Sequence, residues 1–320
     1  MASASRPTVI ALEEHYWDPE LVALFPGREG KRISDVERRL LDLGELRLRE
    51  MDEAGVDIQV LSHGAPGTQK MDVATSTRMA RQTNDRLAKF ITTNPKRFSG
   101  LALLPTPDPA AAADELDRCV TGLGLKGAMI HGLTNGKFID EKQFWPIFAK
   151  AEALDVPIYV HPSFPHPAVI DAYYRDYVGA FPELIGPALG FTVEAATQAI
   201  RLVISGLFER HPNLKIILGH LGEGIPFLLW RIDESLARSH PEPSFKEIFR
   251  RNFYLTTSGN FSDTALTASI TEMGVDRILF SVDWPFISNS LATKWLNATS
   301  LSAADKAKIF SGNAQKLLRL

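Results

Sequence analysis

The sequence predicts a (β/α)8 barrel, because short apolar stretches alternate with longer amphipathic stretches and polar side chains follow several of the apolar ones. Such alternation builds parallel sheets joined by crossover helices. A length of 320 residues suits one α/β barrel with insertions, which needs about 250 residues. No glycine-rich phosphate-binding motif follows a predicted strand, which favours a closed barrel over a doubly wound sheet. We therefore predict a distorted barrel that spans residues 1–320 as a single domain.

Eight strands and eight helices can be placed by their hydrophobic patterns. The predicted strands are 8–15, 58–63, 98–105, 125–132, 156–162, 214–220, 252–259 and 277–285. The predicted helices are 40–54, 75–94, 110–123, 143–154, 192–209, 224–240, 264–273 and 302–320. Two long loops remain, 16–39 and 163–191. Because loops after strands face the active site of a barrel, we expect both to lie over it.

Composition excludes several classes of protein. A formal charge of −3 gives no broad basic surface, so we expect no nucleic-acid partner. No apolar run approaches the ~18 residues of a membrane helix, and the polar first residues are unlike a signal peptide. The single cysteine, Cys119, cannot form an intrachain disulfide and fits a reducing compartment. We expect a cytoplasmic protein with no membrane contact.

Histidines gather at one kind of position. Five of the eight stand at or next to the carboxyl end of a predicted strand: His15, His63, His131, His161 and His220. Asp283 follows the eighth strand in the same way. The carboxyl ends of barrel strands converge on one mouth, so residues that are distant in sequence become neighbours there.

Four of these positions suggest a metal site. Glu13 and His15 are two residues apart and point to one side of a strand, where a buried carboxylate needs a partner or a metal. Each residue has an ordinary explanation: a Glu–His pair, a core histidine at His161, a helix-capping aspartate at Asp283. Together, two imidazoles and two carboxylates suit Zn, Mn or Fe(II). We predict one divalent ion per subunit and no organic cofactor.

His220 is the candidate acid–base residue. Imidazole titrates near neutral pH, so His220 could ligate the ion or move protons beside it. Glu223 and Arg231 follow in the chain and could orient this ring, or could form an ordinary ion pair on a helix surface. For binding a substrate we single out four residues, and four others are weaker candidates for lining the pocket. The four are Phe25, His131, Arg231 and Phe191; the weaker ones are Trp17, His63, Phe164 and Tyr173.

The chain resembles a known family at these residues: the metal-dependent nonoxidative decarboxylases of the amidohydrolase superfamily. The group includes aminocarboxymuconate-semialdehyde decarboxylase, and the resemblance is strongest to the γ-resorcylate (2,6-dihydroxybenzoate) decarboxylases. It covers nearly the whole chain. The matching stretches are ALEEH at 11–15, IILGHLGEGIP at 216–226, WRID at 230–233, TTSGNF at 256–261 and ILFSVDWPF at 278–286.

The resemblance implies specific roles. Glu13, His15, His161 and Asp283 would bind one Zn²⁺ or Mn²⁺, and His220 with Glu223 would form the catalytic pair. Asp283 would also protonate the ring of a hydroxylated benzoate, a small aromatic acid chelated to the ion. Members are commonly homodimers or homotetramers. His131 stands where an asparagine is expected, and the long loops also differ, so the particular substrate stays open.

Two other functions remain possible on the same pattern. A hydrolase or hydratase would use metal-bound water on a lactone or a related substrate. A barrel that only binds or scaffolds would hold no ion and would be insensitive to replacement of Asp283.

Overall fold

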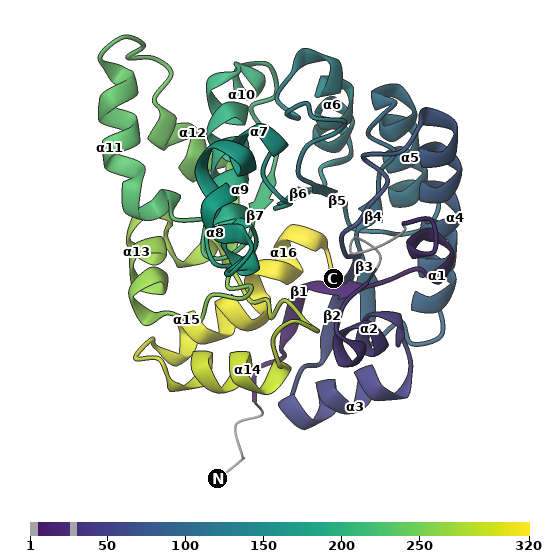
Figure 1. Cartoon of the computed structure of the whole chain (residues 1–320). Coiled ribbons are helices and arrows are strands. Elements are labelled where there is room, and N and C mark those ends of the chain that lie inside the picture. Colours follow the sequence, from purple (N-terminus) through teal and green to yellow (C-terminus); the bar gives the residue numbers. More distant parts are fainter. Residues whose placement is uncertain (1–5, 26–30) are drawn as a thin grey trace.

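A computed structural model describes residues 6–25 and 31–320, and parallel strands form the centre of the molecule (Figure 1). The strands are β1 Ile10–Tyr16, β2 Ile58–His63, β3 Phe98–Gly100, β4 Ala102–Leu103, β5 Ala128–His131, β6 Ile158–His161, β7 Ile216–Leu218, β8 Phe253–Thr256 and β9 Ile278–Leu279. Each strand pairs in parallel with its neighbour in chain order, apart from a break between β3 and β4.

The barrel closes at two irregular places. The predicted strand 98–105 is interrupted at Leu101, whose N–H donates to Leu61 O of β2, so β3 pairs with β2 whereas β4 pairs with β5. Between the last strand and the first, Leu12 and Ser281 form an isolated parallel bridge. His15 N also donates to Trp284 O at 2.8 Å. These contacts complete a distorted eight-stranded barrel, as predicted.

Helices surround the strands (Figure 1). They are α1 Pro19–Val22, α2 Ser34–Leu41, α3 Glu45–Ala54, α4 Val73–Ile91, α5 Pro109–Thr121, α6 Trp145–Leu154, α7 Pro167–Val169, α8 Arg175–Val178, α9 Gly190–Ile204, α10 Leu207–Arg210, α11 Ile225–Ala237, α12 Phe245–Asn252, α13 Asp263–Met273, α14 Asn289–Ala298, α15 Ala303–Ala307 and α16 Asn313–Leu318. Short 3₁₀ or π turns are η1 Lys142–Phe144, η2 Ile170–Tyr174, η3 Pro182–Ile185, η4 Val275–Arg277 and η5 Lys308–Gly312. Among the described residues, no helix combines the length and apolarity that crossing a membrane requires.

Several predicted helices need correction. The segment 40–54 is not one helix: α2 ends at Leu41 and α3 begins at Glu45. Helices α12 and α14 lie outside the predicted helices, because each is short and offers few turns in which a helical period can be recognised. The two long loops contain α1, α2, α7 and α8, so they are partly helical.

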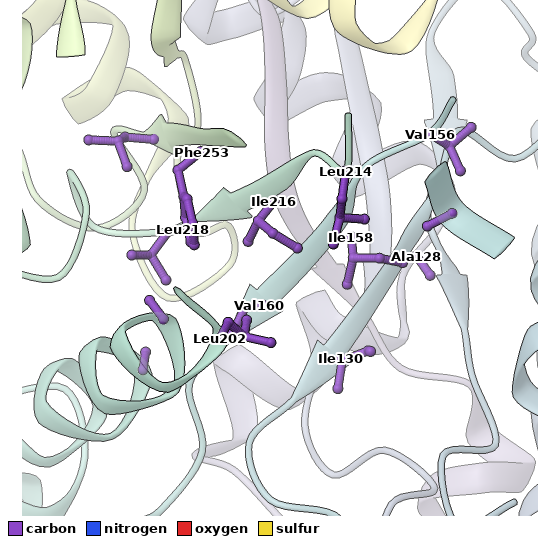
Figure 2. Packing of buried hydrophobic residues seen from close by; sticks show 14 of the residues in the cluster. Ala128, Ile130, Val156, Ile158, Val160, Leu202, Leu214, Ile216, Leu218 and Phe253 are labelled. Carbon is purple, nitrogen blue, oxygen red and sulfur yellow. The ribbon is translucent and has the colours of Figure 1, made fainter. Parts of the chain in front are cut away.

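Two apolar layers hold the barrel together. One layer fills the barrel interior, with side chains from most of the strands, and α16 closes it at one end. Its residues are Ile10, Leu12, Val60, Leu101, Met129, Tyr159, Ile217, Leu279, Ala314, Leu317 and Leu318. The other lies between strands and helices, and Figure 2 shows Val160 of β6 and Ile216 of β7 gathered with Leu202 of α9. Successive strand residues point to opposite faces. Residues of the two layers therefore alternate along each strand. At the carboxyl ends of β5 and β6, His131 and His161 occupy positions that face the barrel interior.

The chain just before β5 lies very close to the chain just before β6, and replacement of the glycine at this point tests that close approach. Gly127 has φ +141°, and a Cβ added there would lie 2.3 Å from Pro157 O. We expect Gly127→Ala to lower the free energy of unfolding by about 3 kcal/mol or more, because such a φ alone costs about 1–3 kcal/mol. Urea denaturation measures the change.

Gly124 supplies the matched control. Its φ is +74° but nothing lies within 4 Å of an added Cβ, so only backbone strain remains. Gly124→Ala should cost about 1–2 kcal/mol. Equal losses in the two variants would contradict the close approach of the strands.

Candidate active site and metal centre

Three of the predicted metal ligands meet at the carboxyl ends of β1 and β6. One ligand atom from each of Glu13, His15 and His161 lies within 4.8 Å of the other two. Glu13 Oε1 is 3.2 Å from His161 Nε2 and 3.9 Å from His15 Nε2. All three residues are buried. Residues separated by almost 150 positions therefore form one compact group of donors, as the convergence of barrel strands requires.

Other residues contact the Glu13 and His15 atoms that are not part of the shared donor group. Tyr159 donates a short hydrogen bond to Glu13 Oε2 and lies 2.8 Å from Thr256 Oγ1. His15 Nδ1 lies 3.2 Å from Ser62 Oγ. Glu13 Oε1 and His15 Nε2 are left without a hydrogen bond to any described residue. Buried polar atoms rarely stay unpaired, so these two inward-facing atoms fit a divalent cation.

Electrostatics also favours the charged form of Glu13. Burial alone would raise the pKa of Glu13, but the imidazoles of His161, His220 and His15 hold that pKa well below its ordinary value. An ionised carboxylate beside imidazole nitrogens is the mixed oxygen and nitrogen donor set that Zn and Mn accept.

Asp283 lies at the edge of this group. Its Oδ1 is 3.5 Å from His15 Nε2. A Cβ added to Gly259 would lie 3.2 Å from Asp283 Oδ2 and 3.2 Å from His220 Cδ2, so the two side chains converge on Gly259. Asp283 therefore stands between the predicted ligands and the predicted acid–base residue.

His220 and Glu223 form a pair in the turn after β7. His220 Nδ1 lies 2.6 Å from Glu223 Oε1, and the Glu223 side chain is fully buried. Burial alone would lower the pKa of His220, but the carboxylate of Glu223, together with those of Glu13 and Asp283, raises it to about 10. The imidazole is thus stabilised in its protonated form, with Nδ1 towards Glu223 and its Cδ2–Nε2 edge towards Gly259.

Four of the predicted site residues have an unusual backbone conformation. Eight described non-glycine residues have positive φ, and four of them are Glu13 at 56°, His220 at 51°, Glu223 at 53° and Asp283 at 74°. At Glu13 the strand also carries a bulge, since its register with β2 shifts between Ala11 and Glu14. Conformations of this kind concentrate at functional sites, where the surrounding structure maintains them.

The candidate substrate-binding residues lie in several places. Phe25 packs against Leu21, Met79 and Leu103. Arg231 is exposed on α11. Their roles in binding remain predictions.

Of the other two candidates, one contacts the donor group. His131 is buried with its Nδ1 3.0 Å from His161 Nδ1. The Phe191 ring is 5.4 Å from that of Phe164. Tyr173, a weaker candidate, has 75% of its surface exposed.

The segment 163–191 borders a cavity next to β6. The cavity has a volume of about 550 Å³ and is lined by Ser163 and Phe164, which follow His161, and by Ile170 and Ile185 further along the segment. The cavity lies beside the end of β6, whereas Tyr173 is exposed to solvent. That this segment covers the active site stays a prediction.

Sequence reasoning missed three residues of the site. Tyr159 precedes His161 by two positions and shares its inward face, a signal that strand alternation could have given. The Phe286 ring centre is 6.0 Å from that of His15, in the stretch already quoted for the resemblance. Ser62 reaches His15 from β2, and no local pattern marks it.

The fold and this donor group together define a class: α/β-barrel enzymes with a divalent metal centre at the carboxyl ends of the strands. A family model described as amidohydrolase matches residues 14–320. The chain belongs to the amidohydrolase family, which confirms the family resemblance stated from the sequence.

Within this family, the chain is similar to several known decarboxylases. The chain is 44% identical to γ-resorcylate decarboxylase of Polaromonas sp. strain JS666, over 97% of this chain and 98% of the relative. It is similar to the crystal structure of a dihydroxybenzoic acid decarboxylase from Polaromonas sp. JS666 with manganese and 2-nitroresorcinol (TM-score 0.89, 42% identity, 98% and 97% coverage). It is equally similar to a 2,6-dihydroxybenzoate decarboxylase in complex with 2,6-dihydroxybenzoate (TM-score 0.89, 42% identity, 98% and 100% coverage).

The His220–Glu223 pair can be tested by titration. We expect Glu223→Gln to lower the pKa of His220 from about 10 by about one unit or more, because burial then acts without the opposite charge that raises it. The imidazole, protonated below its pKa, would lose its proton at a lower pH. NMR titration of the metal-free protein with ¹³C-labelled histidine measures this shift.

Glu234→Gln is the matched control, because Glu234 pairs with Arg238 on the exposed side of α11. It should leave the His220 titration in place. Identical titrations of His220 in the wild type and in Glu223→Gln would contradict the pairing.

Proposed function

We propose that this chain is a metal-dependent carboxy-lyase that removes CO₂ without oxidation from a hydroxylated benzoate of the dihydroxybenzoate type. The observation that carries the proposal is a pair of buried atoms, Glu13 Oε1 and His15 Nε2, that have no hydrogen bond within residues 6–25 and 31–320. They lie beside His161, Asp283 and the His220–Glu223 pair. The relatives named above support the same reaction and favour it over the hydrolase alternative.

One divalent ion per subunit would be held by Glu13, His15, His161 and Asp283. When bound, it would fix the carboxylate and ortho hydroxyl of the substrate and stabilise negative charge on those oxygens. Manganese in the related structure supports Mn²⁺ over Zn²⁺.

Asp283 would supply the proton. Decarboxylation requires a proton at the ring carbon that carries the carboxylate; the carbon–carbon bond then breaks, its electron pair stays with the ring, and CO₂ leaves. Each turnover therefore consumes one proton. Asp283 stands beside the ligand group and next to His220, whose imidazolium would return a proton to it. Glu223 would keep that imidazolium charged and oriented.

Turnover with and without metal tests the proposal. We expect the enzyme loaded with Mn²⁺ to release CO₂ from one or more dihydroxybenzoates, and to lose at least about 100-fold in rate after treatment with a chelator, because the ion holds the substrate. In D₂O the product should carry one deuterium at the carbon that lost CO₂, which NMR detects. Re-adding Mn²⁺ should restore the rate.

Replacement of Asp283 and a panel of lactones complete this experiment. Asp283→Asn should abolish turnover, whereas Asp276→Asn, at an exposed carboxylate that pairs with Lys308, should not. Turnover of lactones without any of the hydroxybenzoates would favour the hydrolase. An enzyme that kept full activity without metal would contradict both.

We also propose that the chain forms a homo-oligomer through α11. This helix exposes 84% of Phe227 and 67% of Trp230, and exposed aromatic patches of this kind mark interaction surfaces. Arg231 follows on the same helix. The single-domain organisation and the cytoplasmic location that the sequence suggested remain predictions.

The oligomer is tested by mass in solution. We expect the wild type to have a mass of two or four chains of 35.4 kDa by light scattering, and Trp230→Glu to shift it towards one chain, because a buried charge opposes association. Leu291→Glu on α14, where 53% of the leucine is exposed, is the control and should keep the wild-type mass. A wild-type protein with the mass of one chain would contradict this interface.

A further inference from the structure

We propose that His131 is a positioning residue for the metal site: it accepts a hydrogen bond from His161 and so holds that ring with Nε2 turned towards the cation. This inference rests on the metal site proposed above. It replaces the substrate-binding role that the sequence suggested for His131.

Strand register places the two rings together. His131 and His161 are register partners at the ends of the paired parallel strands β5 and β6. Both residues follow inward-facing core residues by two positions, Met129 and Tyr159, so their side chains share one face of the sheet. Their ring centres are 4.6 Å apart, with the planes inclined by 64°.

Hydrogen bonds define the protonation of His131. Its Nε2 lies 2.8 Å from the carbonyl oxygen of His63, at the end of β2. A carbonyl oxygen only accepts, so Nε2 carries the proton and donates it. In a neutral imidazole the other nitrogen is then an acceptor. Only 2% of His131 is exposed. Pro162 O, which can only accept, lies 2.7 Å from His161 Nδ1, so that nitrogen carries a proton and the facing Nδ1 of His131 is the acceptor of a neutral ring.

His161 must therefore donate from Nδ1. This nitrogen lies 3.0 Å from His131 Nδ1 and 2.7 Å from Pro162 O, which are both acceptors. One N–H shared between two acceptors satisfies this geometry. If His161 carried its proton on Nε2 instead, the lone pair of Nδ1 would face both acceptors. With its proton on Nδ1, His161 keeps an unprotonated Nε2, which faces Glu13 Oε1 at 3.2 Å.

The chain of contacts runs from His63 O through His131 to His161, and thus from β2 through β5 to β6. Partners that orient a metal-binding histidine fix its tautomer and ring angle, and their loss typically weakens metal binding by about 10–100-fold. Both nitrogens of His131 are occupied within the protein, which leaves none to bind a substrate.

Three variants at position 131 distinguish the effect of the contact with His161 from the effect of the contact with His63 O. Asparagine places its amide oxygen near the position of Nδ1 and can still accept from His161. Glutamine reaches the position of Nε2 and can keep only the contact to His63 O. Alanine removes both contacts.

We would titrate each metal-free protein with Mn²⁺ alone and follow free Mn²⁺ by electron paramagnetic resonance. We expect H131Q and H131A to bind Mn²⁺ about 10–100-fold more weakly than the wild type, and H131N to bind within about threefold of it. His211→Asn is the control, because His211 pairs with Glu152 at 2.8 Å away from the ligand group. It should leave the affinity for Mn²⁺ in place.

The outcomes separate this inference from the proposed function. A wild type that binds no Mn²⁺ would overturn the metal site itself. A wild type that binds one Mn²⁺, with H131N and H131Q equal in affinity, would overturn the positioning role alone. If H131A does not fold, as thermal melting of the metal-free protein would reveal, the comparison of H131N with H131Q still decides.

Discussion

Two adjacent carboxylates, buried on opposite sides of β1, set the constraint on which the site depends. Glu13 and Glu14 are both fully buried, and an ionised carboxylate without a partner is costly in such surroundings. Glu13 turns towards the imidazoles of the site. Glu14 turns away and accepts from Val282 N at 2.9 Å. A metal or positive charge is thus required on one side of β1, and hydrogen-bond donors are required on the other.

The side of β1 that carries Glu14 holds the ligands in place from behind. Arg47 is buried there, donates to His15 O at 2.6 Å and lies 3.9 Å from the centre of the Trp284 ring. Because Val282 and Trp284 flank Asp283, the contacts of Glu14 and Arg47 fix the backbone on both sides of that residue and behind His15. Such a framework can maintain the positive φ of Glu13 and Asp283, which an isolated strand would not adopt.

The sequence predicted the ligand group because strand alternation and the convergence of strand ends are regular rules. It did not predict the bulge at Glu13, since the register shift depends on pairing with β2. The contacts of Phe25 were not predicted for a related reason: its packing against Leu21, Met79 and Leu103 brings a loop against distant elements. The role of His131 also depends on a neighbour 30 residues away, so the strand pattern gives its position but not its partner.

The site is closed on the side of the ligands and more open on the side of the acid–base groups. The side chains of Glu13 and His15 are 0% and 1% exposed, whereas those of Asp283 and His220 are 18% and 22% exposed. A dry ligand side strengthens electrostatic contacts to the cation and to the substrate oxygens. Nonoxidative decarboxylation takes up one proton in each turnover, and that proton must come from water. The partial exposure of Asp283 and His220 suits the proton-relay role proposed for them, because a single barrel mouth can then exclude water from one half of the site and admit it to the other.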